Sequence, residues 1–175
     1  IRVFNPEGKE IGGFSLEWAQ NIQVHRKTGV IYIMTNKNNG YRQAIKKLLK
    51  FSSWKEGKLL AEFAFASGAE YSAELALDDS SDQAILWCAG SLIGKPSLLR
   101  IEDKGDKFEV TTNLMDLNKD RFGVKPRIAV HPETDLIICN DGSAELNGYD
   151  GLTGNEVKLP FPNGADVATG LDGNW

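Results

Sequence analysis

Histidine and cysteine, which often carry out chemistry, recur at matching places in this chain of 175 residues. His25 and His131 each follow a short apolar stretch and open a polar turn, whereas Cys88 and Cys139 each end an apolar stretch. A histidine pair can bind metal or transfer protons, and a cysteine needs a basic neighbour to become a reactive thiolate. The turn sequences favour a capping role for both histidines. No basic residue adjoins either cysteine, so both are predicted to be buried thiols.

Acidic residues gather in two segments that could attract a cation. The first, Asp141–Glu145, is followed by Asp150 but lacks the spacing of a calcium-binding hand, so a β-turn is favoured. The second, Asp78–Asp82, is predicted to be a solvated hairpin. The sequence also lacks the phosphate-loop and nucleophile-elbow motifs, so no catalytic residues are assigned.

Composition excludes two classes of protein. The net charge is −4 and the basic residues are dispersed, which argues against a nucleic-acid partner. The tightest basic group is Lys46, Lys47 and Lys50, which is predicted to lie on the solvent side of a strand. No apolar run reaches the roughly 18–20 residues of a membrane-spanning helix, so no membrane span is predicted.

The elements that must position these residues follow from an internal repeat. Gly8, Gly57, Gly105 and Gly154 are spaced 49, 48 and 49 residues apart, and each closes a similar phrase. A period near 50 in a strand-rich chain is typical of repeated supersecondary units. Each glycine is predicted to occupy a tight turn with positive φ between two strands.

A second phrase lies between these glycines and reads as strand, polar turn, strand. It spans residues 21–36, 75–89 and 127–140, and it begins again at Asp166. Alternation and β-branched residues bounded by Gly, Pro, Asn and Asp indicate strands. With the strands on either side of each glycine, every unit has four short antiparallel strands, the pattern of a β-propeller blade.

The sequence therefore predicts an all-β fold, a β-propeller segment of about three and a half four-stranded antiparallel blades with a repeat of about 50 residues. Residues 41–50 could instead form a basic amphipathic helix, but the corresponding segments of later units contain Pro, Gly and charge, which favours a strand. One helical turn is allowed within 115–122. The whole chain is treated as a single domain, with blade parts at 1–14, 22–65, 75–114, 128–159 and 167–175.

Several phrases resemble the NHL and YVTN-type repeats of six- to eight-bladed propellers. They are Arg127-Ile-Ala-Val-His-Pro132, Asp172-Gly-Asn174 and Leu98-Leu-Arg-Ile-Glu-Asp-Lys-Gly105. The resemblance spans the chain and implies a blade scaffold rather than an activity. Related propellers include lactonases, strictosidine-synthase-like enzymes, amine dehydrogenase subunits and interaction modules. The resemblance favours a secreted or periplasmic location, and the remainder of the ring is expected from further sequence or a second copy.

In such propellers, the loops entering the first strands and those joining the second and third strands surround one mouth of the central channel. We therefore expect a scaffold that binds a protein partner or small ligand there. The alternatives are a metal-dependent hydrolase of the lactonase type, with a divalent cation such as calcium, and a redox-enzyme subunit; no other cofactor is evident. The candidate binding residues are Trp18, Asn21, Asn36, Glu70, Tyr71, Arg121, Arg127, Asn140, Asp141 and Asp166.

Overall fold

The computed structural model describes residues 1–38, 43–65, 68–69, 73–92, 96–117, 127–131, 134–140 and 146–159. This part of the chain is all-β, with four antiparallel sheets and one helical turn, α1 (Leu114–Leu117). Within these ranges, no helix has the length and apolar character needed to cross a membrane.

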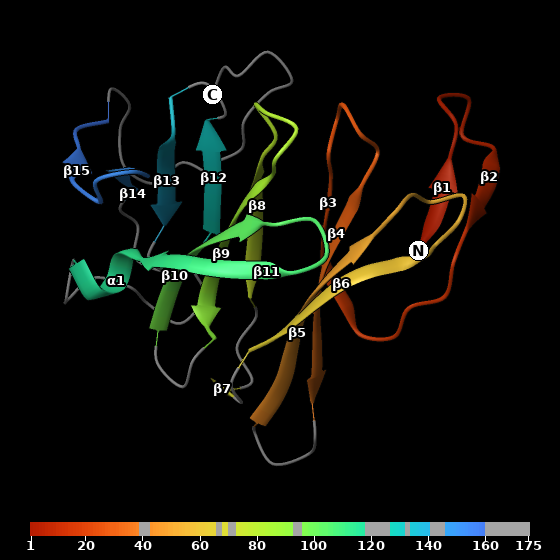
Figure 1. The fold of residues 1–175 in the computed structure, drawn as a ribbon, viewed down its shortest axis with the longest axis horizontal. Coiled ribbons are helices and arrows are strands. Elements are labelled where there is room, and N and C mark those ends of the chain that lie inside the picture. The colour runs from red at the N-terminus through yellow and green to blue at the C-terminus, as the bar shows by residue number, and fades with distance from the viewer. Residues whose placement is uncertain are drawn as a thin grey trace.

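Each sheet is built from strands that are consecutive in the chain (Figure 1). Sheet A contains β1 (Arg2–Phe4) and β2 (Glu10–Gly13). Sheet B contains β3 (Ala19–Val24), β4 (Ile31–Asn38), β5 (Gln43–Phe51) and β6 (Leu59–Ala64), and β7 (Gly68–Ala69) pairs with β5. Sheet C contains β8 (Glu74–Asp78), β9 (Ile85–Ser91), β10 (Pro96–Asp103) and β11 (Phe108–Asn113). Sheet D contains β12 (Arg127–His131), β13 (Leu136–Asn140), β14 (Leu146–Asp150) and β15 (Glu156–Val157).

The strand prediction is confirmed in every described segment. Sheets B, C and D follow the expected four-strand order. The helical alternative for residues 41–50 is wrong over its described part, since 43–50 belongs to β5. The helical turn allowed within 115–122 overlaps α1, which begins one residue earlier, and 118–122 lie outside the described residues. The predicted strand within 167–175 lies outside the described residues.

The four repeat glycines adopt the left-handed conformation predicted for them. Gly8, Gly57, Gly105 and Gly154 have φ values of 78°, 58°, 95° and 73°. Each lies in the connection between two paired strands: Gly8 between β1 and β2, Gly57 between β5 and β6, Gly105 between β10 and β11, and Gly154 between β14 and β15. A side chain is strained at such angles, which explains the spacing of these glycines in the sequence.

The sheets pack face to face in the order A, B, C, D. One core joins Met34 and Leu48 of sheet B to Leu75 and Leu86 of sheet C. A second core joins sheet C to sheet D and includes Trp87. A third core joins the opposite face of sheet B to the N-terminal segment. Sheet C is therefore apolar on both faces, and its strands contain little of the polar alternation of a one-sided sheet.

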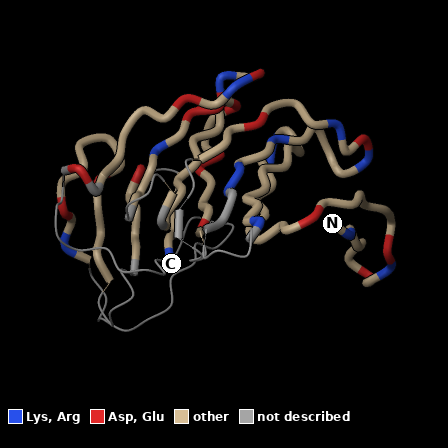
Figure 2. Tube along the Cα trace, turned by 90° about the horizontal axis from the view of Figure 1, so that it is seen from below, with Lys and Arg blue, Asp and Glu red and all other residues tan. Residues whose placement is uncertain are grey.

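Two predictions about exposure are wrong because both faces of the inner sheets are covered. Lys46 and Lys50 are buried rather than on the solvent side, and of that group only Lys47 is partly exposed. Asp78 and Asp79 are likewise buried, so only the rest of that predicted hairpin is solvated. Charges of both signs are interspersed along the described chain (Figure 2).

Both histidines lie at turns as predicted, and the cysteine prediction is confirmed. His25 opens the β3–β4 turn, where its carbonyl oxygen accepts a hydrogen bond from Gly29 N at 2.8 Å, and its ring Nε2 lies 2.9 Å from Ser81 O. His131 accepts a bond from Thr134 N at 3.3 Å. Cys88 and Cys139 are both buried and form no disulfide. Burial raises the pKa of the Cys88 thiol, which disfavours the reactive thiolate.

Candidate functional site

The first strands of three sheets lie side by side and begin at the same end. β3 contacts β8, and β8 contacts β12. Asn21, Glu74 and Arg127 occupy equivalent positions 53 residues apart and form a chain of contacts across the three sheets. Asn21 Nδ2 donates to Glu74 Oε2 at 3.2 Å, and Arg127 Nη1 donates to Glu74 Oε1 at 3.4 Å. The Glu74 carboxylate of sheet C therefore contacts the sheets on both sides of it, B and D.

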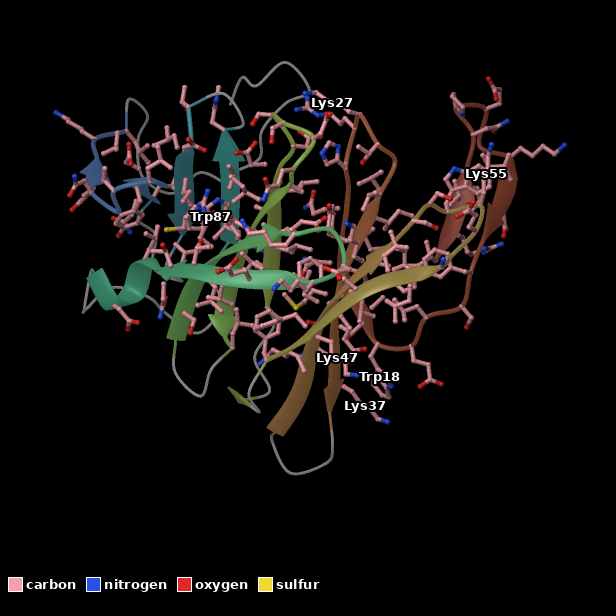
Figure 3. All side chains as sticks on the ribbon, in the orientation of Figure 1. Trp18, Lys27, Lys37, Lys47, Lys55 and Trp87 are labelled. Carbon is pink, nitrogen blue, oxygen red and sulfur yellow. The ribbon has the colours of Figure 1, made fainter. Side chains whose placement is uncertain are left out.

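Local backbone irregularity brings a second asparagine to this end of sheet B. Trp18 has a left-handed φ of 62°, and the β3–β4 register shifts between Ala19 and Asn21. Trp18 O then accepts a hydrogen bond from Asn36 N at 3.0 Å. The Trp18 side chain is half exposed, and Figure 3 shows it with Lys37 at the end of sheet B opposite Lys27.

Asn21, Asn36 and Lys46 share the face of sheet B that packs on sheet C. Asn21 lies opposite Met34, and Asn36 lies opposite Lys46 in the β4–β5 register. Side chains on one sheet face alternate along each strand, so these three polar groups border the apolar core. Burial lowers the pKa of the Lys46 ammonium. We call Asn21, Asn36 and Lys46, with Glu74 and Arg127, the polar end.

The polar end contains two acceptors that lack donors. The Oδ1 atoms of Asn21 and Asn36 are buried and have no hydrogen-bond partner. An unsatisfied buried acceptor costs about 1–3 kcal/mol, so natural proteins have few of them. Such an arrangement is suited to a molecule that brings hydrogen-bond donors, or to a cation that prefers oxygen ligands.

The opposite end of the same interface holds a polar cluster whose groups are satisfied. Asp103 accepts bonds from Tyr32 OH at 2.6 Å, from Gly105 N at 2.8 Å and from Lys50 Nζ at 2.8 and 3.0 Å. Lys50 Nζ also donates to Gly105 O at 2.8 Å. Burial, and then the bond to Asp103, raise the pKa of Tyr32. A cavity of about 530 Å³ adjoins this cluster and is lined by Lys50, Asp82, Gln83, Asp103, Lys104 and Gly105.

We interpret this second cluster as structural. Lys50 of β5 and Asp103 of β10 belong to the third strands of neighbouring sheets, so the ion pair spans sheets B and C. The Asp103 carboxylate is bonded by three residues, and no side-chain atom of Tyr32, Lys50 or Asp103 is among the buried polar atoms without a partner, unlike the two amide oxygens. Its role is to join sheet B to sheet C.

Another pair of equivalent positions joins the same two sheets near Lys27. The Arg26 guanidinium binds Asp79, with Nη2 to Oδ1 at 2.6 Å, and holds the pKa of that carboxyl below its usual range. Asp135 has a left-handed φ of 51°, and the pKa of its carboxyl is shifted upward rather than downward. Its burial and the nearby Asp78 carboxylate raise its pKa.

The structure describes only part of the predicted rim. Asn21 and Arg127 contact the same carboxylate of Glu74, and Trp18 O accepts a bond from Asn36 N; that these four residues line a channel mouth stays a prediction. Asn140 pairs with Arg127 in the β12–β13 register, and its side chain lies outside the description. The other predicted binding residues also lie outside the described residues: Glu70, Tyr71, Arg121, Asp141 and Asp166.

Sequence reasoning missed Glu74 and Lys46. Adding 53 to the position of Asn21, the interval between the first strands, would have identified Glu74 as its neighbour. No sequence signal indicated that Lys46 is buried, because that depends on sheet C covering sheet B.

The described residues contain no group of three or more His, Cys, Asp or Glu side chains that could hold a metal ion. The metal-dependent hydrolase therefore stays a prediction. No protein-family model, curated protein or solved structure matches this chain. The geometry of the site is therefore the basis for a functional proposal.

Proposed function

We propose that the four sheets are consecutive parts of a β-propeller and that the polar end binds a small polar ligand at the mouth of its channel. Three observations support the propeller. The strands of each sheet follow chain order, the first strands of sheets B, C and D adjoin one another, and contacts recur between positions 53 residues apart.

The buried amide oxygens of Asn21 and Asn36 carry the proposal for the ligand. They require a partner that donates hydrogen bonds, such as a hydroxyl or amine group. Arg127 is largely exposed, so its remaining donors are open to an acceptor on the same ligand. A small molecule fits better than a flat protein surface, because both amide oxygens are buried between the sheets.

Thermal unfolding with added ligands tests this function. The probes are a panel of monosaccharides and polyols, a panel of primary amines, and calcium chloride. A probe at 100 times its dissociation constant stabilises by about 2.7 kcal/mol, which corresponds to roughly 5–10 °C for a chain of this size. We expect a hydroxyl- or amine-bearing probe to reach this shift.

Matched variants locate the binding. Asn21→Leu and Asn36→Leu are expected to abolish the shift, and Lys27→Gln, at the opposite end of sheet B (Figure 3), to preserve it. The proposal fails if no hydroxyl- or amine-bearing probe shifts the transition, or if both leucine variants respond as the parent does.

Calcium binding is a second candidate because amide and carboxylate oxygens are its usual ligands. Asn21, Asn36 and Glu74 supply such oxygens at the polar end. Isothermal titration of the protein with calcium chloride separates this role from ligand binding by hydrogen bonds. Binding that disappears in Glu74→Gln would favour the hydrolase hypothesis, and hydrolysis of a simple lactone would then be assayed. A redox-subunit role stays a prediction.

A further inference from the structure

We propose that the cavity between the β8–β9 turn and the β10–β11 turn binds an α-amino acid as its zwitterion, with the ammonium group on Asp82 and the carboxylate on Lys104. This inference is independent of the ligand proposed for the polar end, because the cavity lies at the opposite end of the interface between sheets B and C. Its volume of about 530 Å³ falls within the range of about 300–1,000 Å³ that is usual for small-molecule sites.

One wall of the cavity consists of charged groups that already satisfy one another. Lys50 Nζ donates to both carboxylate oxygens of Asp103 and to Gly105 O. The Asp103 carboxylate also accepts bonds from Tyr32 OH and Gly105 N. These groups shape the cavity, but their hydrogen-bonding capacity is largely used. A charged ligand must therefore be recognised by the other lining residues.

Asp82 supplies a carboxylate on a turn that is held in place. Its side chain lines the cavity, and within the described part of the chain it accepts no hydrogen bond and forms no ion pair. The turn itself is anchored to sheet B, since Lys27 Nζ donates to Ser80 O at 2.6 Å and His25 Nε2 lies 2.9 Å from Ser81 O. A carboxylate on an anchored turn binds an ammonium group with a smaller loss of conformational entropy than one on a mobile loop.

Lys104 supplies the opposite charge to the same cavity. Its Nζ atom donates to Glu102, and this bond raises the pKa of the Lys104 ammonium, which favours the charged form. An ammonium group has three donors, so two are open to a ligand as far as the described residues are concerned. In this part of the chain Lys104 pairs with Glu102 and not with Asp82, although Asp82 lines the same cavity.

The two charges select a ligand that carries both signs. A simple anion would meet the Asp82 carboxylate, and a simple cation would meet the Lys104 ammonium, whereas a zwitterion places a favourable charge against each. Gln83 adds an amide that can both donate and accept.

The cavity also has room for the side chain of the amino acid. Among the described residues other than its chain neighbours, none has a heavy atom within 4 Å of the position that a Cβ would take at Gly105. The lining is therefore open at the β10–β11 turn, where it includes backbone without a side chain.

Nuclear magnetic resonance of the ¹⁵N-labelled protein tests the proposal, with each of the common L-amino acids added separately. We expect at least one of them to shift the amide signals of Asp82, Gln83 and Gly105 to a saturating value. The N-acetylated form of that amino acid lacks the ammonium charge, and its carboxamide form lacks the carboxylate. Because each loses a charge-assisted contact, we expect both analogues to bind at least about tenfold more weakly.

Matched variants locate the two contacts. Asp82→Asn and Lys104→Gln should each weaken binding of the amino acid at least about tenfold. Asp106→Asn and Lys107→Gln change the same residue types in the β10–β11 turn outside the cavity lining, and they should leave the dissociation constant unchanged. The proposal is overturned if no amino acid shifts these signals, if either analogue binds as tightly as the zwitterion, or if Asp82→Asn or Lys104→Gln binds as the parent does.

Discussion

The ion pair between Lys50 and Asp103 offers the sharpest test of how the sheets are joined. Their side chains are only 10% and 7% exposed, and the carboxylate also binds Tyr32 OH and Gly105 N. The change Asp103→Asn leaves the Lys50 ammonium buried without its counter-charge. Removing one partner of a buried pair costs about 3–5 kcal/mol.

This loss is large compared with the total stability of a domain, about 5–15 kcal/mol. For a chain of this length it corresponds to a fall of about 6–20 °C in the unfolding midpoint. The double variant Lys50→Met/Asp103→Asn removes both charges and leaves an amide that still accepts from Tyr32. Because replacing both members of a buried pair is often close to neutral, we expect most of the stability to return.

Urea unfolding followed by circular dichroism measures both values. The expected coupling between the two substitutions is at least about 2 kcal/mol. A loss below about 1 kcal/mol in Asp103→Asn would indicate a solvent-screened pair and refute the reasoning. A double variant as unstable as the single one would do the same.

Three further predictions concern other contacts. Asp79→Asn should cost about 1.5–3 kcal/mol at pH 7, because Arg26 loses a charged acceptor. Since the pKa of Asp79 is lowered on folding, its contribution is present above the ordinary carboxyl pKa and lost as pH falls through the folded value, which pH-dependent unfolding measures. Asp135→Asn should raise stability by a few tenths to about 1 kcal/mol at pH 7, because the raised pKa marks an unfavourable carboxylate; the gain should fall as pH drops through the raised pKa and vanish below the ordinary carboxyl pKa. Gly148→Ala should cost about 1–3 kcal/mol in thermal unfolding, because its Cβ would lie 2.8 Å from Val157 O; an unchanged midpoint would contradict the β14–β15 packing.

Local patterns predicted the strands well. A strand or a tight turn is specified mainly by residues close together in the sequence. Ile22 and Val24 alternate with polar residues and lie on a strand, and Gly57 and Gly105 lie in turns with positive φ. The order of strands within each sheet follows too, since consecutive strands with short connections tend to pair.

Burial was harder to predict because it depends on which sheet covers which face. Alternation correctly places Lys46 and Lys50 on one side of β5, but it does not indicate that sheet C lies against that side. The contact between Asn21 and Glu74 likewise arises between strands 53 residues apart. The repeat interval contained that information, whereas the local pattern did not.

The measurement that bears most directly on the ligand site is the stability of Asn36→Leu in the absence of any added molecule. If Asn36 serves ligand binding, its unpaired amide oxygen destabilises the unliganded protein. The leucine variant should then have a free energy of unfolding about 1 kcal/mol higher in urea unfolding. If Asn36→Leu is instead less stable than the parent, the amide contributes to the fold, and the account of the polar end as a binding site is wrong.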